Sequence, residues 1–227
     1  MNCSARLWSP VAEVLSRRGV DVQCRPLRGT SVEDCAADLL ARLPPRFALA
    51  GLSLGGVVAM ALVRLAPERV AGLALLSTNP RPPTAAQRRS WDSDLAALRA
   101  GHSPRELQEA LLPVLLSDRA RSGPLAEEVL TMADEVGPEQ LTNQLAVQAS
   151  RVDERPGLTR VRVPTLVIAG GADTICPPDW HVEVAALVSG ASRQVLEGVG
   201  HLLPLEAPDA VAGHLGRWSG ELSRRQP

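Results

Sequence analysis

The stretch FALAGLSLGG, residues 47–56, decides the fold of this chain. Its first four residues are apolar without polar alternation, which is typical of a strand covered on both faces. Apolar residues then run from Val57 to Val63 and stop before Pro67, and this pattern predicts a buried helix. A strand, a glycine-rich turn and a helix in direct succession indicate an α/β protein with a parallel sheet.

Ser53 is the candidate nucleophile of this turn, because Gly51-Leu52-Ser53-Leu54-Gly55 fits the pattern G-x-S-x-G. Glycines at both ends let the strand and the helix approach closely, so that the turn lifts the serine hydroxyl above the sheet. The backbone N–H of Leu54 opens the helix and is predicted to donate to a developing oxyanion. A plain glycine turn in which Ser53 caps the helix is the alternative interpretation.

His201 is the candidate general base that a serine hydroxyl needs. It lies in a loop after the last predicted strand, 192–196, and before the final helix. Its place late in the chain fits the order Ser…Asp…His of one group of catalytic triads. The remaining histidines lie in helical or exposed contexts: His102, His181 and His214.

Asp173 is the candidate acid that would fix the tautomer of His201 and stabilise its charged form. It follows an apolar strand predicted at 164–169, so its carboxylate lies at the edge of the sheet where such sites form. Asp179 and Glu206 compete less well, because both fall at or inside helix starts, where capping is the ordinary role. The alternative for Asp173 is a turn-forming role after two glycines.

The rest of the chain predicts an α/β core interrupted by a helical insertion. Further strands are expected at 20–24 and 70–77, alternating with helices, which favours a mostly parallel sheet flanked by helices. Residues 81–157 carry no strand pattern, and we expect them to form a helical cap. Its predicted helical segments are 84–100, 103–117, 124–136 and 138–150. Residues 1–80 and 158–227 then form the core.

Composition excludes several classes of function. The chain has 24 basic and 25 acidic residues and no tyrosine, and all of its basic residues are arginine. We therefore expect no lysine or tyrosine chemistry and no binding to nucleic acid or an acidic membrane. No apolar run is long enough to span a membrane, and no signal peptide is visible. The four cysteines form no C-x-x-C pair, so we expect free thiols in a reducing cytoplasm.

These motifs together resemble the α/β-hydrolase superfamily, in its single-domain group with a helical cap. The resemblance runs through residues 51–56, 67–70, 164–170 and 200–201, with 206–208, in family order. At the level of groups, the chain is similar to enol-lactonases and to pimeloyl-carrier-protein methyl ester esterases. The resemblance implies a serine hydrolase, without metal or organic cofactor, that acts on a carboxylic ester, thioester or lactone.

In that reading, the implied roles are Ser53 as nucleophile, His201 as base, Asp173 as its partner and Leu54 N–H as oxyanion donor. The partner is a small acyl substrate, free or bound to a carrier, and the oligomeric state stays open. Serine at the elbow argues against the dehalogenase and epoxide-hydrolase branches, which need a carboxylate nucleophile. The alternatives are cofactor-free perhydrolase or haloperoxidase chemistry with the same triad, and a binding module that keeps the fold without catalysis.

The substrate is expected to be aliphatic, because the cap segments offer leucine, valine, alanine and methionine, with Trp91 as the one cap aromatic. Several cap arginines are candidates for binding an acidic substrate or a carrier protein. A solvated helix face is the favoured interpretation for them. They are Arg81, Arg88, Arg89, Arg99 and Arg105.

The beginning of the chain departs from the family pattern. In the family, a strand ending in His-Gly precedes the first helix, whereas Leu7-Trp8-Ser9-Pro10 already resembles that helix. We therefore expect strand 46–50 to have an unpaired edge unless strand 20–24 fills it, and the oxyanion hole to be incomplete or built from the N-terminus. We also expect the working protein to carry about 20 to 40 more N-terminal residues.

Overall fold

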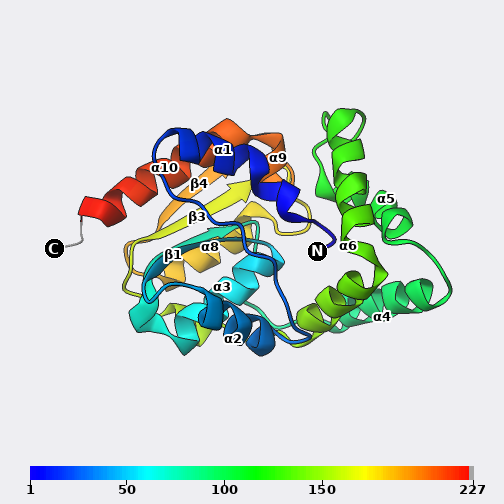
Figure 1. The fold of residues 1–227 in the computed structure, drawn as a ribbon, viewed down its shortest axis with the longest axis horizontal. Helices are drawn as coiled ribbons and strands as arrows, with labels where there is room; N and C mark the ends of the chain where they lie inside the picture. Colours follow the sequence, from blue (N-terminus) through cyan, green and yellow to red (C-terminus); the bar gives the residue numbers. More distant parts are fainter. Residues whose placement is uncertain (225–227) are drawn as a thin grey trace.

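The computed structural model describes residues 1–224 of the 227-residue chain. A sheet of four parallel strands forms its centre, in the order β1-β2-β3-β4 (Figure 1). The strands are β1 (Phe47–Leu52), β2 (Val70–Leu76), β3 (Thr165–Gly170) and β4 (Ser192–Leu196). Parallel neighbours require crossover connections, and helices supply them here. The predicted α/β class with a parallel sheet is therefore confirmed.

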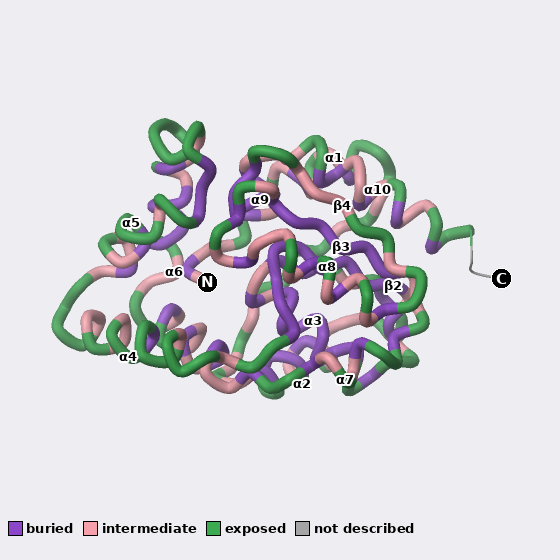
Figure 2. The backbone as a smooth tube through the Cα atoms, turned by 180° about the vertical axis from the view of Figure 1, so that it is seen from behind, coloured by how far each residue is buried: buried purple, intermediate pink, exposed green. Residues whose placement is uncertain are grey.

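Helices cover both faces of this sheet, and two apolar clusters result (Figure 1). Alternate residues of β3 divide between them: Ile168 packs on one side and Val167 on the other. This division explains why β3 is apolar without interruption, and β3 is buried along its whole length (Figure 2). The first side carries η1 (Ala5–Trp8), α1 (Ser9–Arg17), α9 (Leu203–Glu206) and α10 (Pro208–Arg224). The second carries α2 (Val32–Arg42), α3 (Leu54–Leu65), η2 (Pro67–Arg69), α7 (Arg155–Leu158) and α8 (Pro178–Leu187).

Between β2 and β3, the chain forms further helices that lie to one side of the sheet (Figure 1). These are α4 (Ala85–Arg99), α5 (Pro104–Leu115) and α6 (Pro124–Ala149). The helix α6 is broken at Gly137, whose φ of 72° is not helical, and Pro138 follows. The four helical segments expected here therefore exist, with the last two joined across this kink. No helix within residues 1–224 combines the length and the apolar character that crossing a membrane requires.

The strand expected at 20–24 is wrong: these residues run as an irregular segment between α1 and α2. Val20 and Val22 are only half-buried and pack against the α1 side of the core instead of pairing with a strand. Within residues 1–224, β1 has β2 as its only partner strand, so the expected unpaired edge is present. On the face of β1 opposite α3, Ala48 and Ala50 are exposed.

Candidate active site

Ser53 lies at the turn between β1 and α3 in a backbone conformation that few non-glycine residues adopt. Its φ is 52° and its ψ is −115°. The serine N–H still completes the sheet, donating to Leu76 O at 3.0 Å. A Cβ on Gly51 would lie 2.4 Å from the carbonyl oxygen of Gly55, so this close turn requires glycine at position 51. The sharp elbow predicted from the sequence is present.

Gly55 was expected to be needed for the close approach of strand and helix, and this is wrong, because a Cβ there would meet no atom within 4 Å. The second glycine that close packing requires is Gly56, where a Cβ would lie 2.7 Å from Thr78 Cγ2. Thr78 follows β2, and its hydroxyl donates to the carbonyl oxygen of Ser53 at 2.8 Å. The end of β2 therefore supports the elbow directly.

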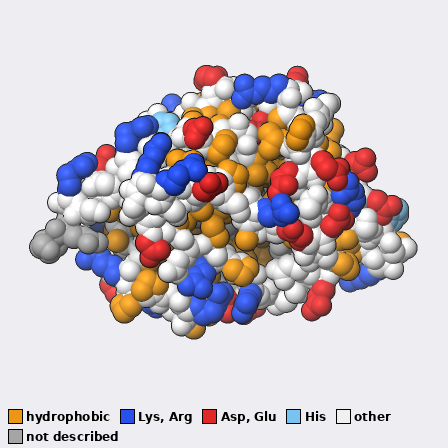
Figure 3. All heavy atoms as spheres, turned by 45° about the horizontal axis from the view of Figure 1, so that its top comes forward, with side chains coloured by type: hydrophobic (Ala, Val, Ile, Leu, Met, Phe, Trp, Pro, Cys, Tyr) orange, Lys and Arg blue, Asp and Glu red, His pale blue; other side chains and the backbone are white. Residues whose placement is uncertain are grey.

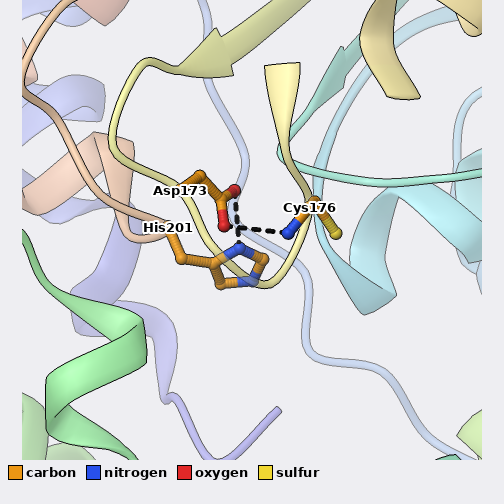
Figure 4. Close-up of side chains that lie close together, drawn as sticks. All are labelled: Asp173, Cys176 and His201. Carbon is orange, nitrogen blue, oxygen red and sulfur yellow. Dashed lines mark hydrogen bonds and ion pairs between the residues drawn. The ribbon is translucent and has the colours of Figure 1, made fainter. Parts of the chain in front are cut away.

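Asp173 and His201 are brought together at the carboxyl end of β3. His201 Nδ1 donates to Asp173 Oδ2 at 2.9 Å, and both residues are buried (Figure 4). Asp173 Oδ1 accepts from the N–H groups of Ile175 and Cys176, each at 2.9 Å. Burial would raise the pKa of Asp173, but the hydrogen bond and charge of His201 outweigh it and hold that pKa below its ordinary value. A proton on Nδ1 leaves Nε2 of the neutral ring free to accept another.

Ser53 and His201 line the same cavity, which has a volume of about 240 Å³. Within residues 1–224, Ser53 Oγ has no hydrogen-bond partner, and the Leu54 N–H likewise has no acceptor. The hydrogen bond between a catalytic serine and its histidine is often long or absent until substrate binds, so its absence here does not argue against the pair. Met1 also lines the cavity, so the first residue of this chain lies beside the elbow. The serine hydroxyl and the helix N–H are thus both available to a ligand.

Cys176 lies beside this pair, and its ligand atom and those of Asp173 and His201 are within 4.8 Å of one another. Burial, followed by the charge of Asp173, raises the pKa of Cys176 to about 12. Asn79, Arg151 and the N-terminal ammonium oppose that rise only in part. Metal binding needs a thiolate, and the Asp173 carboxylate already accepts three hydrogen bonds. The backbone N–H of Cys176 therefore positions Asp173, with the sulfur turned away (Figure 4).

Glu206 is a supporting residue to which the sequence analysis gave a capping role and a place in the family pattern, but no contact with the His201 loop. Its carboxylate accepts from Gly200 N at 3.0 Å and from both N–H and Oγ of Ser117, which follows α5. The His201 N–H donates to Leu115 O at 3.0 Å, so the same loop is also tied to α5 itself. The available signal was an acid five positions after the candidate base, in the short helix that follows it.

His181 lies in a helix, as expected, and it is fully buried beneath the loop that follows β2. Its Nε2 accepts from the Thr78 N–H at 3.1 Å. This bond leaves Nδ1 as the protonated nitrogen, which donates to Pro177 O at 3.2 Å. Burial lowers the pKa of His181, so the neutral ring is favoured. Next to this loop, Ser77 Oγ is buried and makes no hydrogen bond, although it lies near enough to lower the Asp173 pKa.

Most of the cavity wall is apolar and comes from the helices between β2 and β3. One part of the wall is polar instead and includes an arginine that sequence reasoning missed, Arg151. The apolar lining includes Trp91, Leu107, Leu111, Val114, Leu115, Leu141 and Leu145. The polar lining includes Asn2, Asn79, Asp94, Gln108, Gln148 and Arg151.

The five cap arginines considered from the sequence all lie outside the cavity lining. Arg81 pairs with Glu183, and Arg105 pairs with Glu127 and Asp134. Arg88, Arg89 and Arg99 are exposed. Acidic and basic side chains are interspersed on the surface seen in Figure 3. The solvated-face interpretation of these arginines agrees with their positions.

Comparison with known proteins places the chain in a family. The sequence profile of the alpha/beta hydrolase family matches residues 5–214. A pimeloyl-(acyl-carrier protein) methyl ester esterase of Xanthomonas oryzae pv. oryzae is 33% identical over 192 residues, covering 80% of this chain and 74% of the relative. A Variovorax paradoxus protein named RutD, a carbamate hydrolase by name, is 32% identical over 222 residues, covering 87% and 80%. A thermophilic esterase from Thermogutta terrifontis has a TM-score of 0.86 at 26% identity, covering 97% of this chain and 86% of that structure.

This chain therefore belongs to the alpha/beta hydrolase family. The four-stranded parallel sheet, with helices on both faces and the Ser53 elbow after β1, is the structural counterpart of that assignment. The family resemblance inferred from the residues alone is confirmed, and the chain is an enzyme of the hydrolase class.

Proposed function

We propose that this protein is a serine hydrolase that cleaves carboxylic esters, thioesters or lactones through an acyl-enzyme on Ser53. One observation carries the proposal: the buried Asp173–His201 hydrogen bond of 2.9 Å adjoins a cavity that Ser53 also lines. The family assignment and the esterase names of similar proteins support the ester as the bond that is broken. The carrier-protein ester named for one relative makes a carrier-bound acyl group a candidate substrate here.

The proposed reaction has two steps, acylation of Ser53 and hydrolysis of the acyl-enzyme, and His201 transfers a proton in both. Ser53 Oγ attacks the acyl carbon while its proton passes to His201 Nε2, and Asp173 stabilises the imidazolium. The Leu54 N–H donates to the oxyanion at the start of α3. Collapse of the intermediate transfers the proton from Nε2 to the leaving alcohol or thiol. Water then attacks the acyl-enzyme, gives its proton to His201, and releases the carboxylic acid as Ser53 regains its hydrogen.

The helices between β2 and β3, within residues 81–157, are proposed to act as the cap that encloses the acyl group. They supply most of the apolar lining, and the cavity of about 240 Å³ is below the roughly 300–1,000 Å³ of sites for drug-sized ligands. A short aliphatic acyl group fits both features. The free thiols Cys3, Cys24, Cys35 and Cys176 favour a reducing compartment such as the cytoplasm.

The test is the replacement Ser53→Ala, measured on p-nitrophenyl butyrate. Loss of the nucleophile is expected to lower kcat by at least about a thousandfold, while the fold is retained. Ser93→Ala, an exposed serine on α4 outside the cavity, is the matched control and should match the wild type. A fluorophosphonate probe should label the wild type and the control at Ser53 and leave Ser53→Ala unlabelled. Retention of most turnover in Ser53→Ala, or no labelling of the wild type, contradicts the proposal.

A further inference from the structure

Arg151 is a buried cation in the wall of the candidate active-site cavity, directly after α6. Its side chain and backbone together are 6% exposed. The guanidinium donates three hydrogen bonds, to the neutral oxygens Gln148 Oε1, Asn79 Oδ1 and Arg81 O. Since an arginine has five N–H groups, two are left without an acceptor. One of them is on Nε, which is buried and has no hydrogen-bond partner.

No carboxylate neutralises this charge within the part of the chain that the structure describes. Arg151 takes part in no ion pair, and burial lowers its pKa, with the Cys176 thiol as the one acid that opposes the effect and no carboxylate beside it. A nearby arginine provides the contrast: Arg64 meets the buried carboxylate of Glu154 at 3.0 Å. Buried charges are normally paired, because an isolated one loses its hydration without compensation. Residues 1–224 therefore offer Arg151 no carboxylate partner, and its position in the cavity wall leaves it open to an anion from outside.

Unpartnered polar atoms also collect around this cavity. Four buried side-chain atoms in residues 1–224 lack a hydrogen-bond partner, and three of their residues line the cavity. Two of these three are donors, Arg151 Nε and Gln108 Nε2, and the third is Asn2 Oδ1. Unsatisfied buried donors are costly unless a ligand or water completes them. An acceptor oxygen of a ligand in the cavity would satisfy Arg151 Nε, which is the donor that carries the charge.

We propose that the substrate carries a free carboxylate, besides the bond that is cleaved, and that Arg151 binds this carboxylate. The inference deepens the proposed function and rests on it. The carboxylate is placed on the same side of the cavity as the elbow, because Arg151 donates to Asn79 Oδ1 at 3.0 Å, and the preceding residue, Thr78, donates to the Ser53 carbonyl oxygen at 2.8 Å. The substrate class is therefore a half-ester, thioester or lactone of a short acid that has a second carboxylate.

Among residues 1–224, Asp94 is the one carboxylate in the cavity lining, and it provides an internal control. It lies on α4, and no nitrogen of Arg151 is within ion-pair distance of it. Burial raises the pKa of Asp94, and no arginine offsets that rise. Asp94 and Arg151 therefore do not form an ion pair. The replacement Asp94→Asn should leave anion binding as strong as in the wild type, or make it stronger.

The experiment compares two esters that differ only in the remote group, monomethyl glutarate and methyl pentanoate. The wild type is expected to favour monomethyl glutarate by at least about tenfold in kcat/KM, since a charged hydrogen bond is then satisfied. Arg151→Gln should lose about 10- to 100-fold on monomethyl glutarate, mainly through KM, and stay within about threefold on methyl pentanoate. Arg151→Lys should recover part of the loss, because it restores the charge without the planar fork.

Binding measured without turnover separates this inference from the proposed function. Titration calorimetry of Ser53→Ala with monomethyl glutarate should show binding that is lost in Ser53→Ala with Arg151→Gln. Arg89→Gln, exposed and outside the cavity, is the matched charge control and should bind as before. Equal losses on both esters would make Arg151 structural and overturn the inference, as would equal binding of both esters. Failure of both turnover and probe labelling, with selective binding intact, would contradict the proposed function alone.

Discussion

His181 supports the site at the scale of a single residue, because both of its ring nitrogens are engaged. The Thr78 N–H binds Nε2, and the Thr78 hydroxyl in turn donates to the Ser53 carbonyl oxygen. A neutral imidazole can accept from an N–H, whereas the imidazolium cannot. The conformation of the elbow therefore depends on a histidine that contacts neither substrate nor nucleophile side chain.

Acid should destabilise the protein through His181. Burial lowers the pKa of His181 in the folded state, so below its ordinary value of 6.5 the unfolded chain binds a proton that the folded chain does not. The free energy of unfolding should then fall as pH drops below 6.5, by at most about 1.4 kcal/mol per pH unit for this residue. Urea unfolding at several pH values between 7.5 and 5 measures the slope, and His181→Gln should flatten it.

The control for that slope is His102→Gln, an exposed histidine whose removal should leave it unchanged. His214 has a pKa lowered by partial burial and Arg217, and it adds a smaller part of the same slope. Asp173 acts in a separate window: its lowered pKa stabilises the fold above 3.8, and this contribution is lost as pH falls further. Identical slopes in His181→Gln and the wild type would contradict the assignment to His181.

At the scale of elements, Glu206 on α9 joins the His201 loop to the residues that follow α5. The replacement Glu206→Gln keeps the shape but removes the charge that Gly200 and Ser117 share. Because the ring of His201 would be held less firmly, we expect kcat to fall about tenfold with KM changed less than about twofold. Steady-state kinetics on p-nitrophenyl butyrate measure both constants.

Two further measurements define the role of Glu206 as positioning. Circular dichroism should show that Glu206→Gln keeps its secondary structure, and labelling by a fluorophosphonate should slow without disappearing. Glu221→Gln, an exposed acid on α10, is the control and should match the wild type. A rise in KM with kcat unchanged would instead indicate a role in binding.

The elements differ in how much of them the sequence could predict. Local sequence patterns predicted β1, the elbow at Ser53 and the strand before Asp173, because apolar runs and glycines determine structure within a few residues. The segment 20–24 alternates apolar and polar residues, as a strand can, but a strand also needs a partner, and no local pattern supplies one. The need for Gly56 arises from Thr78 on another element, and the burial of Arg151 depends on three segments. These contacts are tertiary, so spacing along the chain could not reveal them.

At the scale of the whole molecule, we expect the unpaired edge of β1 to determine whether the protein self-associates at high concentration. Ala48 and Ala50 are exposed beside backbone groups that no strand within residues 1–224 pairs. Such edges invite pairing with a second chain. Residues 1–227 should therefore self-associate as concentration rises, and Ala48→Lys with Ala50→Lys should reduce this. Sedimentation velocity across a range of concentrations measures it.

The matched control for the edge is Ala41→Lys, which adds a charge at an exposed position on α2. It should associate as the wild type does, because it leaves the β1 edge unchanged. Sedimentation as a monomer at every concentration, in the wild type, would contradict the expected association.

The origin of the cavity lining has a consequence for how such an enzyme can diverge. Ser53, Asp173 and His201 follow strands of the sheet, whereas most of the apolar wall and Arg151 lie between β2 and β3, in the segment proposed to act as the cap. Under the proposed function, mutation can therefore remodel the segment between β2 and β3 for a new substrate while the three proposed reacting residues stay unchanged. Recombination within residues 81–157 would exchange the chemical identity of the accepted acid without touching the bond-breaking apparatus.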